Sequence, residues 1–295
     1  MDQTRISRSW SDITSEAGGR GECDGEWAVR RSIVAYGVRI GIRTNRPRFL
    51  KRILEHAPPL WKPSSAPSVE REFSFRVARR PPPKSRGLPH LLLDDLETAT
   101  ESTSLDEILE TFEARVKMYV AERAPRRVFV HAATVGWHGK AIIVPGQTMS
   151  GKTSLAAELV RAGATYYSDE YAVLDMFGRV HPYPRPLAIR REGLFKQEAC
   201  SAEEIGGVTG TTSLPVGLVI VTRFKPGVSW RPARLSPGPA ALELLANAIS
   251  ARRKPGVVLP TLKKVVSKAT CLKGLRGEAE ETARLILERW SPERR

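Results

Sequence analysis

The residues that could do chemistry in this chain begin with a glycine-rich stretch, VPGQTMSGKTSLAAEL, which matches G-x-x-x-x-G-K-[ST]. In such a loop the backbone N–H groups surround phosphate oxygens, because glycine has no Cβ to block the approach, and the following helix presents its positive end. The lysine reaches the β- and γ-phosphates, and the last hydroxyl ligates Mg²⁺. The pattern predicts a nucleoside triphosphate site made by Gly146, Gln147, Thr148, Met149, Ser150, Gly151, Lys152 and Thr153.

The sequence around this loop supplies the context that the motif requires. The apolar run AIIVP (141–145) predicts a strand before the loop, and SLAAELVRAG predicts a helix that ends at Gly163. VFVHAATV (128–135) reads as a buried strand, and LPVGLVIVTRF (214–224) as another central one. A structural glycine-rich turn is the alternative reading, and the position between strand and helix favours the phosphate loop.

The motif does not name a reaction, because motors, GTPases and small-molecule kinases share it. The chain has no N-K-x-D sequence for guanine, and its apolar strand ends in Thr222 and Arg223 rather than in an aspartate. The nearest acids after the loop are Asp169 and Glu170.

One order of residues carries a family resemblance: His131 near a strand end, then the loop, a helix ending in RAG, and the acidic pair Asp169-Glu170. This order resembles the HPr serine kinase/phosphorylase family. The rest of the chain resembles, more loosely, the HPr-kinase-related proteins of proteobacteria and of lasso-peptide gene clusters. The resemblance implies an α/β fold with a P-loop core related to the phosphoenolpyruvate carboxykinases, and a homo-oligomer.

The resemblance also implies roles. Asp169 would take the proton of an attacking serine hydroxyl, and Glu170 would help Thr153 to hold Mg²⁺. His131 would donate a hydrogen bond to a γ-phosphate oxygen. The alternatives are a capping aspartate for Asp169 and a core histidine for His131.

The chain departs from the family signature L-E-[IV]-R-G-x-G in the stretch PLAIRREG (186–193). Ala188 replaces the glutamate and Arg191 the first glycine, whereas Arg190 matches and is a candidate for neutralising the transferred phosphoryl group. Glu192 is close in sequence but is expected to point elsewhere. Since the missing carboxylate would serve the reverse reaction, we expect a kinase without phosphorylase activity.

The remaining sequence suggests three segments. Residues 1–27 are polar and rich in Gly and Ser, which predicts a mobile tail. Residues 28–124 predict a small α+β domain with strands at 32–43 and 72–77, a helix from PRFLKRILEHAPPLW, and a helix capped by Ser104 and Glu107. Pro125 ends that helix, and we expect the P-loop domain to cover 125–295.

Composition restricts the function. The 47 Lys and Arg exceed the 32 Asp and Glu, for a formal charge of +15, with a basic patch at 249–273. No RNP, zinc-finger or helix-turn-helix pattern accompanies this charge, so we expect a solvated surface and no nucleic-acid partner. No apolar run approaches the ~18–20 residues of a membrane span. Three distant cysteines and the lack of a secretory signal predict a cytoplasmic protein.

Together these features predict an ATP- and Mg²⁺-dependent kinase that acts on a hydroxyl, expected to be a serine of a small protein or peptide. Two alternatives stay open. The same site could serve a small metabolite, or the chain could be a nucleotide-sensing module with little turnover.

Overall fold

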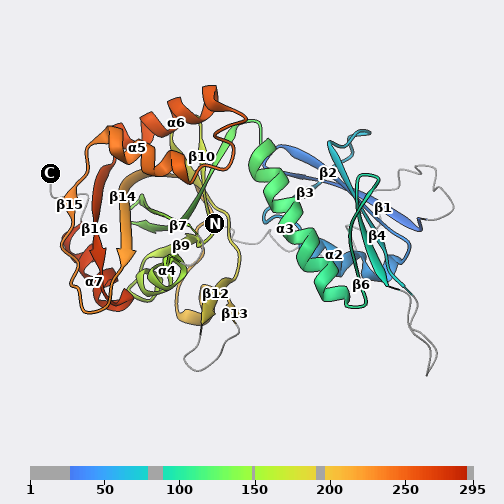
Figure 1. Cartoon of the computed structure of the whole chain (residues 1–295), viewed down its shortest axis with the longest axis horizontal. Coiled ribbons are helices and arrows are strands. Elements are labelled where there is room, and N and C mark those ends of the chain that lie inside the picture. Colours follow the sequence, from blue (N-terminus) through green and yellow to red (C-terminus); the bar gives the residue numbers. More distant parts are fainter. Residues whose placement is uncertain (1–26, 79–88, 148–149, 191–196, 291–295) are drawn as a thin grey trace, which may run out of the picture. The chain divides into compact units, whose positions relative to one another are not determined.

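The computed structural model describes residues 27–78, 89–147, 150–190 and 197–290. The chain divides between Lys117 and Met118 into two compact units, each with mixed α and β structure (Figure 1). The division falls inside helix α3 (Leu105–Arg123), ahead of the joint that we expected at Pro125. Of the predicted tail, residues 1–26 lie outside the described residues. Trp27 is buried with the Arg43 guanidinium 4.6 Å from its ring, so it belongs to the packed unit.

In the first unit the described residues form a six-stranded sheet in the order β3-β1-β2-β4-β5-β6. The β2–β4 pair is parallel and the other pairs are antiparallel. The strands are β1 (Val29–Ala35), β2 (Val38–Thr44), β3 (Lys62–Pro63), β4 (Arg71–Arg76), β5 (His90–Asp94) and β6 (Glu97–Ser102). A 3₁₀ turn (Pro47–Phe49) leads into the short helix α2 (Leu50–Glu55).

The prediction of one strand at 32–43 is wrong, because the segment folds into the hairpin of β1 and β2. Tyr36 and Gly37 make the turn with φ of 49° and 87°, and positive φ at both central residues is the hairpin geometry that matches strand twist. The buried side chains change phase across this turn, from odd positions such as Ile33 to even ones such as Ile40. A two-residue turn without Asn or Asp is therefore hidden in the alternating pattern.

The predicted cap of α3 is confirmed in part. The backbone N–H of Glu107 donates to Ser104 Oγ at 3.5 Å, whereas the Glu107 carboxylate accepts from the hydroxyl of Ser102 rather than from the backbone of Ser104. The apolar face of α3 contributes Phe112, whose ring meets Phe73 and Phe75 edge-on at centroid distances of 5.1 and 5.0 Å. All three rings are fully buried and form the centre of this unit's core.

The second unit contains an eight-stranded sheet among its described residues, ordered β11-β10-β7-β8-β14-β16-β15, with β9 also on β7. Since β11 pairs with β14 as well, strands β7, β8, β14, β11 and β10 form a closed circuit of pairings. The strands of this sheet are β7 (Arg127–Trp137), β8 (Lys140–Pro145), β9 (Thr165–Ser168), β10 (Tyr171–Asp175), β11 (Arg179–His181), β14 (Leu214–Phe224), β15 (Ala233–Arg234) and β16 (Thr270–Arg276). The hairpin of β12 (Leu187–Arg190) and β13 (Gln197–Cys200) lies outside it.

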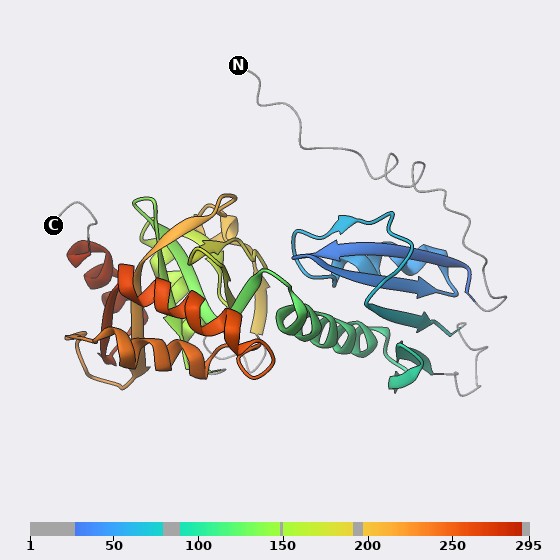
Figure 2. The same ribbon diagram turned by 90° about the horizontal axis from the view of Figure 1, so that it is seen from above.

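Helices cover both faces of this sheet (Figures 1 and 2). Helices α4 (Lys152–Arg161) and α7 (Ala279–Arg289) pack on one face, and α5 (Pro237–Ala246) and α6 (Pro255–Lys268) on the other. Alternation along β14 serves both cores, since Leu218 and Ile220 face α4 and α7 while Val219 faces α5 and α6. Because β14 is buried on both of its faces, its sequence is a nearly continuous apolar run.

Most local predictions in this unit are confirmed, including the two strands that precede the loop, β7 and β8, helix α4 after it, and the hairpin at Gly178. The basic patch at 249–273, which we expected to be solvated surface, includes α6 and part of β16, and its basic side chains are exposed except for the half-buried Lys254. Helix α6 exposes Lys263, Lys264 and Lys268 but buries Val258 and Leu262. Part of this charge is therefore the outer face of an amphipathic helix. No described helix has the length and apolarity needed to cross a bilayer.

Phe112→Ala should destabilise the first unit by about 3–5 kcal/mol, because it empties the space between two buried rings. Urea denaturation measures the change, with Leu96→Ala as the control. Leu96 is 86% exposed, so its truncation should stay within about 0.5 kcal/mol. A loss below about 1 kcal/mol for Phe112→Ala would contradict its central place in this core.

Candidate active site

The glycine-rich loop lies between a strand and a helix, as predicted. Strand β8 ends at Pro145, and α4 begins at Lys152 with Gly151 as its N-cap. Thr148 and Met149 lie outside the described residues, so the loop is described at its two ends. Its strand is central in the sheet, with β7 on one side and β14 on the other.

The two glycines of the motif meet different physical demands. Gly151 has φ of 80°, and a Cβ there would lie 2.2 Å from Arg276 Nη2. A Cβ on Gly146 would lie 2.7 Å from Ser150 Oγ. A side chain at Gly151 would be strained by the positive φ and would displace the buried Arg276, whereas at Gly146 it would require the Ser150 hydroxyl to rotate away.

Lys152 is almost entirely removed from solvent, with 7% of its surface exposed. Its Nζ donates to the backbone oxygen of Gln147 at 2.6 Å. Burial lowers the pKa of Lys152 to about 8, although the negative charges of Asp169 and Glu170 oppose that shift. The ammonium is thus poorly hydrated and held inside the loop, where an anionic phosphate would restore the favourable interactions that it loses by burial.

Asp169 lies against the start of the same helix. Its Oδ2 accepts a hydrogen bond from Thr153 Oγ1 at 3.0 Å, and its Oδ1 accepts from the hydroxyl of Tyr166 at 2.9 Å. The Tyr166 hydroxyl also lies 2.8 Å from the backbone oxygen of Arg185, so its one proton is shared between two acceptors. Burial raises the pKa of Asp169, and the charge of Glu170 adds to the effect, while the two hydrogen bonds counteract it in part.

Strand β7 positions this acid, because β9 and β10 both pair with it. Between them, Ser168 Oγ accepts from the backbone N–H groups of Glu170 and Tyr171 at 3.1 and 2.9 Å. The N–H of Ala132 on β7 donates to the backbone oxygen of Glu170 at 3.1 Å. The turn that carries Asp169 and Glu170 is therefore tied to the strand next to the loop.

His131 contacts the first glycine of the loop through both its side chain and its backbone. Its Nδ1 lies 2.8 Å from the backbone oxygen of Gly146, and the N–H of Gly146 donates to the His131 oxygen at 3.2 Å. A carbonyl only accepts, so Nδ1 carries the proton, and a neutral ring then presents Nε2 as an acceptor. Donation to a phosphate oxygen, the role expected from the sequence, would require a protonated imidazole. The geometry itself supports a role in positioning the loop.

The other predicted residues are placed less directly. The charge of Glu170 acts on Lys152, but the carboxylate that contacts Thr153 is that of Asp169. Arg190 ends β12, a hairpin strand that packs beside α4 through Leu187, and its side chain is outside the described part of the structure. Arg191 and Glu192 also lie outside the described residues.

Arg276 is the site residue that sequence reasoning missed. It ends β16, is 3% exposed, and donates from Nη2 to the backbone oxygen of Gly151 and from Nη1 to that of Gly277, both at 3.0 Å. Its Nε has no hydrogen-bond partner among the described residues. Burial lowers the pKa of Arg276, opposed by the charge of Glu278. No motif marks this arginine, and only the strand order brings it to the loop.

No described group of three or more His, Cys, Asp or Glu side chains could hold a metal ion by itself. A magnesium ion bound with a nucleotide does not need such a group, because it takes one or two protein ligands together with substrate phosphates and water. Thr153 with the nearby Asp169 fits that arrangement. The donors present therefore suit a metal that arrives with the nucleotide.

Arg276→Gln should weaken ATP binding by about tenfold, since the loop loses a charged hydrogen-bond donor at Gly151. Calorimetry with ATP and Mg²⁺ measures the effect. Arg223→Gln is the matched control, because Arg223 is exposed at the equivalent end of the neighbouring strand β14. Equal affinities for the two variants would show that Arg276 does not support the loop.

The sequence was also compared with known proteins, and neither the family models nor the curated proteins gave a match. The likeness to the HPr kinases therefore depends on the motif residues alone. What the geometry adds is a buried lysine, a hydroxyl–carboxylate pair and a buried arginine around one glycine-rich loop.

Proposed function

We propose that the protein is an ATP- and Mg²⁺-dependent kinase that transfers the γ-phosphoryl group to a hydroxyl, with a serine of a small protein or peptide as acceptor. The observation that carries the proposal is the hydrogen bond from Thr153 to Asp169 beside the buried ammonium of Lys152. A phosphate-binding lysine, a hydroxyl suited to Mg²⁺ and a carboxylate are the parts that phosphoryl transfer requires.

In this mechanism the chain binds the phosphates through the backbone of the loop, the start of α4 and Lys152. Mg²⁺, held by Thr153 and the nucleotide, would supply charge neutralisation at the phosphates. The acceptor oxygen attacks the γ-phosphorus, its proton passes to Asp169, and ADP leaves with the bridging oxygen. The raised pKa of Asp169 suits this task, because a base works best when its proton affinity lies near the working pH.

The contact between Asp169 and Thr153 also allows a second role. A carboxylate at hydrogen-bond distance from a metal-ligating hydroxyl can orient that hydroxyl and the metal's waters. The two roles differ in what a neutral substitute would disturb, since a base affects the rate and a metal partner affects nucleotide binding.

The P-loop core of the HPr-kinase type, the serine acceptor, the cytoplasmic location and a homo-oligomer are parts of this proposal that rest on resemblance and composition. No nucleic-acid partner is proposed. Ala188 is exposed on β12 and brings no carboxylate to the site, which supports a one-way kinase. The alanine in place of the family glutamate also favours the second candidate function, a nucleotide-sensing module with little turnover.

The affinity for ATP should decline as the pH rises through the pKa of Lys152. A lowered pKa means that the ammonium is charged below about 8 and neutral above it. Calorimetry at about pH 7 and about pH 9 should show roughly tenfold weaker binding at the higher pH, because one unit above the pKa leaves about a tenth of the lysine charged. Lys152→Ala should bind ATP weakly at both pH values and show no turnover. An affinity in the wild type that is constant with pH would contradict the assigned contact.

Asp169→Asn should slow phosphoryl transfer on the order of 10²–10⁴-fold with ATP affinity nearly unchanged, because the amide cannot accept the proton. The assay follows ADP formation from ATP and Mg²⁺ with a pool of serine-containing peptides. Glu170→Gln is the matched control and should retain more activity.

Activity within a few-fold of the wild type in Asp169→Asn would exclude Asp169 as the base. A combined loss of rate and of Mg²⁺-dependent ATP binding would instead assign Asp169 to the metal.

A further inference from the structure

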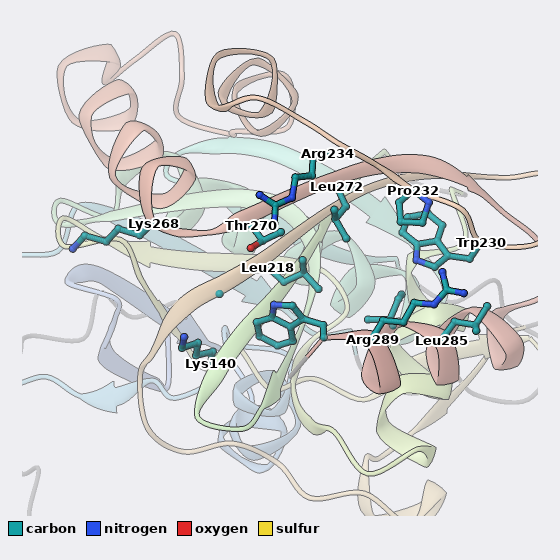
Figure 3. A pocket seen from close by; sticks show the side chains of 13 residues that line it. Lys140, Leu218, Trp230, Pro232, Arg234, Lys268, Thr270, Leu272, Leu285 and Arg289 are labelled. Carbon is teal, nitrogen blue, oxygen red and sulfur yellow. The ribbon is translucent and has the colours of Figure 1, made fainter. Parts of the chain in front are cut away.

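A cavity of about 290 Å³ lies at the amino-terminal ends of the parallel strands β8, β14 and β16 (Figure 3). The glycine-rich loop and Arg276 lie at the carboxyl ends of β8 and β16, so the two sites occupy opposite ends of the same sheet. The residues of the loop, His131 and Asp169 are absent from the lining of this cavity. The cavity is therefore separate from the candidate active site.

One part of the lining is apolar and aromatic. Trp230 is 2% exposed and packs with Leu218 and Ile286 in the core under α4 and α7. Trp290 lies across Gly217, where a Cβ would be 2.6 Å from the indole ring. The close approach of ring to backbone requires glycine at this position, and it places a second indole in the cavity wall.

The other part of the lining is cationic. Four basic side chains come from four separate elements: Lys140 from β8, Arg234 from β15, Lys268 from the end of α6 and Arg289 from the end of α7. Figure 3 shows Lys140, Arg234 and Arg289 around Leu218 and Thr270, with Lys268 farther out in this view. The lining contains no aspartate or glutamate.

These four cations also lack the partners that nearby basic residues have. Within the described ranges none of them makes an ion pair or a side-chain hydrogen bond, whereas Lys273 pairs with Glu243 and Arg284 with Glu288. The dipoles of α6 and α7 favour a cation in their last turns. That effect does not account for Lys140 and Arg234, which lie on strands. Arg234, Lys268 and Arg289 are exposed and Lys140 is half-buried, so solvent screens their mutual repulsion, while an anion in the cavity would gain attraction from all four.

We propose that this cavity binds a small organic anion, an aromatic ring that carries a phosphate or carboxylate group. Trp290 is half-buried and offers an indole surface against which an aromatic ring can pack, above the floor that the buried Trp230 helps to form. Arginine and lysine provide charged donors for the anionic group. The volume lies just below the usual range of ligand pockets, about 300–1,000 Å³, so it suits a compact ligand with one ring system. This binding site goes beyond the proposed kinase activity, which uses the other end of the sheet.

Phenyl phosphate and phenylacetate are the test probes. Their binding to the full chain is measured by calorimetry and by NMR of the tryptophan indole N–H groups. At least one should bind with a Kd on the order of 1 mM or below, as expected for a ligand of this size, and should shift indole signals. Which of the two binds decides between phosphate and carboxylate. Benzyl alcohol lacks the charge and inorganic phosphate lacks the ring, so both should bind several-fold more weakly and leave the indole signals nearly unchanged.

Variants locate the site. Arg289→Gln and Arg234→Gln should each weaken the bound probe about tenfold, the loss expected for one charged hydrogen bond. Arg284→Gln, on the same helix as Arg289 but outside the lining, should leave the affinity unchanged, as should Lys152→Ala in the glycine-rich loop. Absence of binding by both aromatic anions would overturn the proposal. Binding that survives both lining substitutions, or that Lys152→Ala abolishes, would overturn it equally.

Discussion

The burial of the Lys152 ammonium is the constraint on which the candidate site depends. A charged group that is almost fully removed from water is unfavourable unless nearby dipoles and opposite charges compensate. Here the Gln147 carbonyl accepts its hydrogen bond at 2.6 Å, and Asp169 and Glu170 supply negative charge. The same carboxylates are held where Asp169 also reaches Thr153. Loop, acid pair and helix start thus form one coupled electrostatic unit, and phosphate is the kind of ligand that it suits.

Strand β7 brings the parts of this unit together. It pairs with β8, which leads into the loop, and with β9 and β10, which carry the acid pair between them. His131 on the same strand fixes Gly146 through side chain and backbone. The loop and the acid pair are separated in the sequence, but the strands that carry them all pair with β7, and this brings them together. On the other side of β8, strands β14 and β16 bring Arg276 to Gly151, which gives the loop a second buried cation at its end.

The features that could be predicted from sequence are those encoded locally. Lys152 and Thr153 lie in a contiguous motif, and the apolar run before them and the helical pattern after them predict the flanking elements. Asp169 could be selected because its spacing from the loop resembles that of a known family. Arg276 could not, because it lies 125 residues from Gly151 in the chain and only strand order makes them neighbours. The distal cavity is hidden for the same reason, since its cations come from four elements. The turn at Tyr36 and Gly37 was missed because alternating residues precede and follow it directly and neither turn residue is Asn or Asp.

The proposed function requires that the glycine-rich loop bind the phosphates of ATP together with Mg²⁺. A calorimetric titration of the wild-type chain with ATP and with AMP, each with and without Mg²⁺, measures this binding. We expect a Kd for ATP between roughly 1 µM and 1 mM, the range typical of enzyme substrates. Binding should strengthen with Mg²⁺ and be much weaker for AMP, which lacks the phosphates that we propose as partners of Lys152 and Thr153. No binding of ATP, or equal affinities for ATP and AMP without an effect of Mg²⁺, would contradict it.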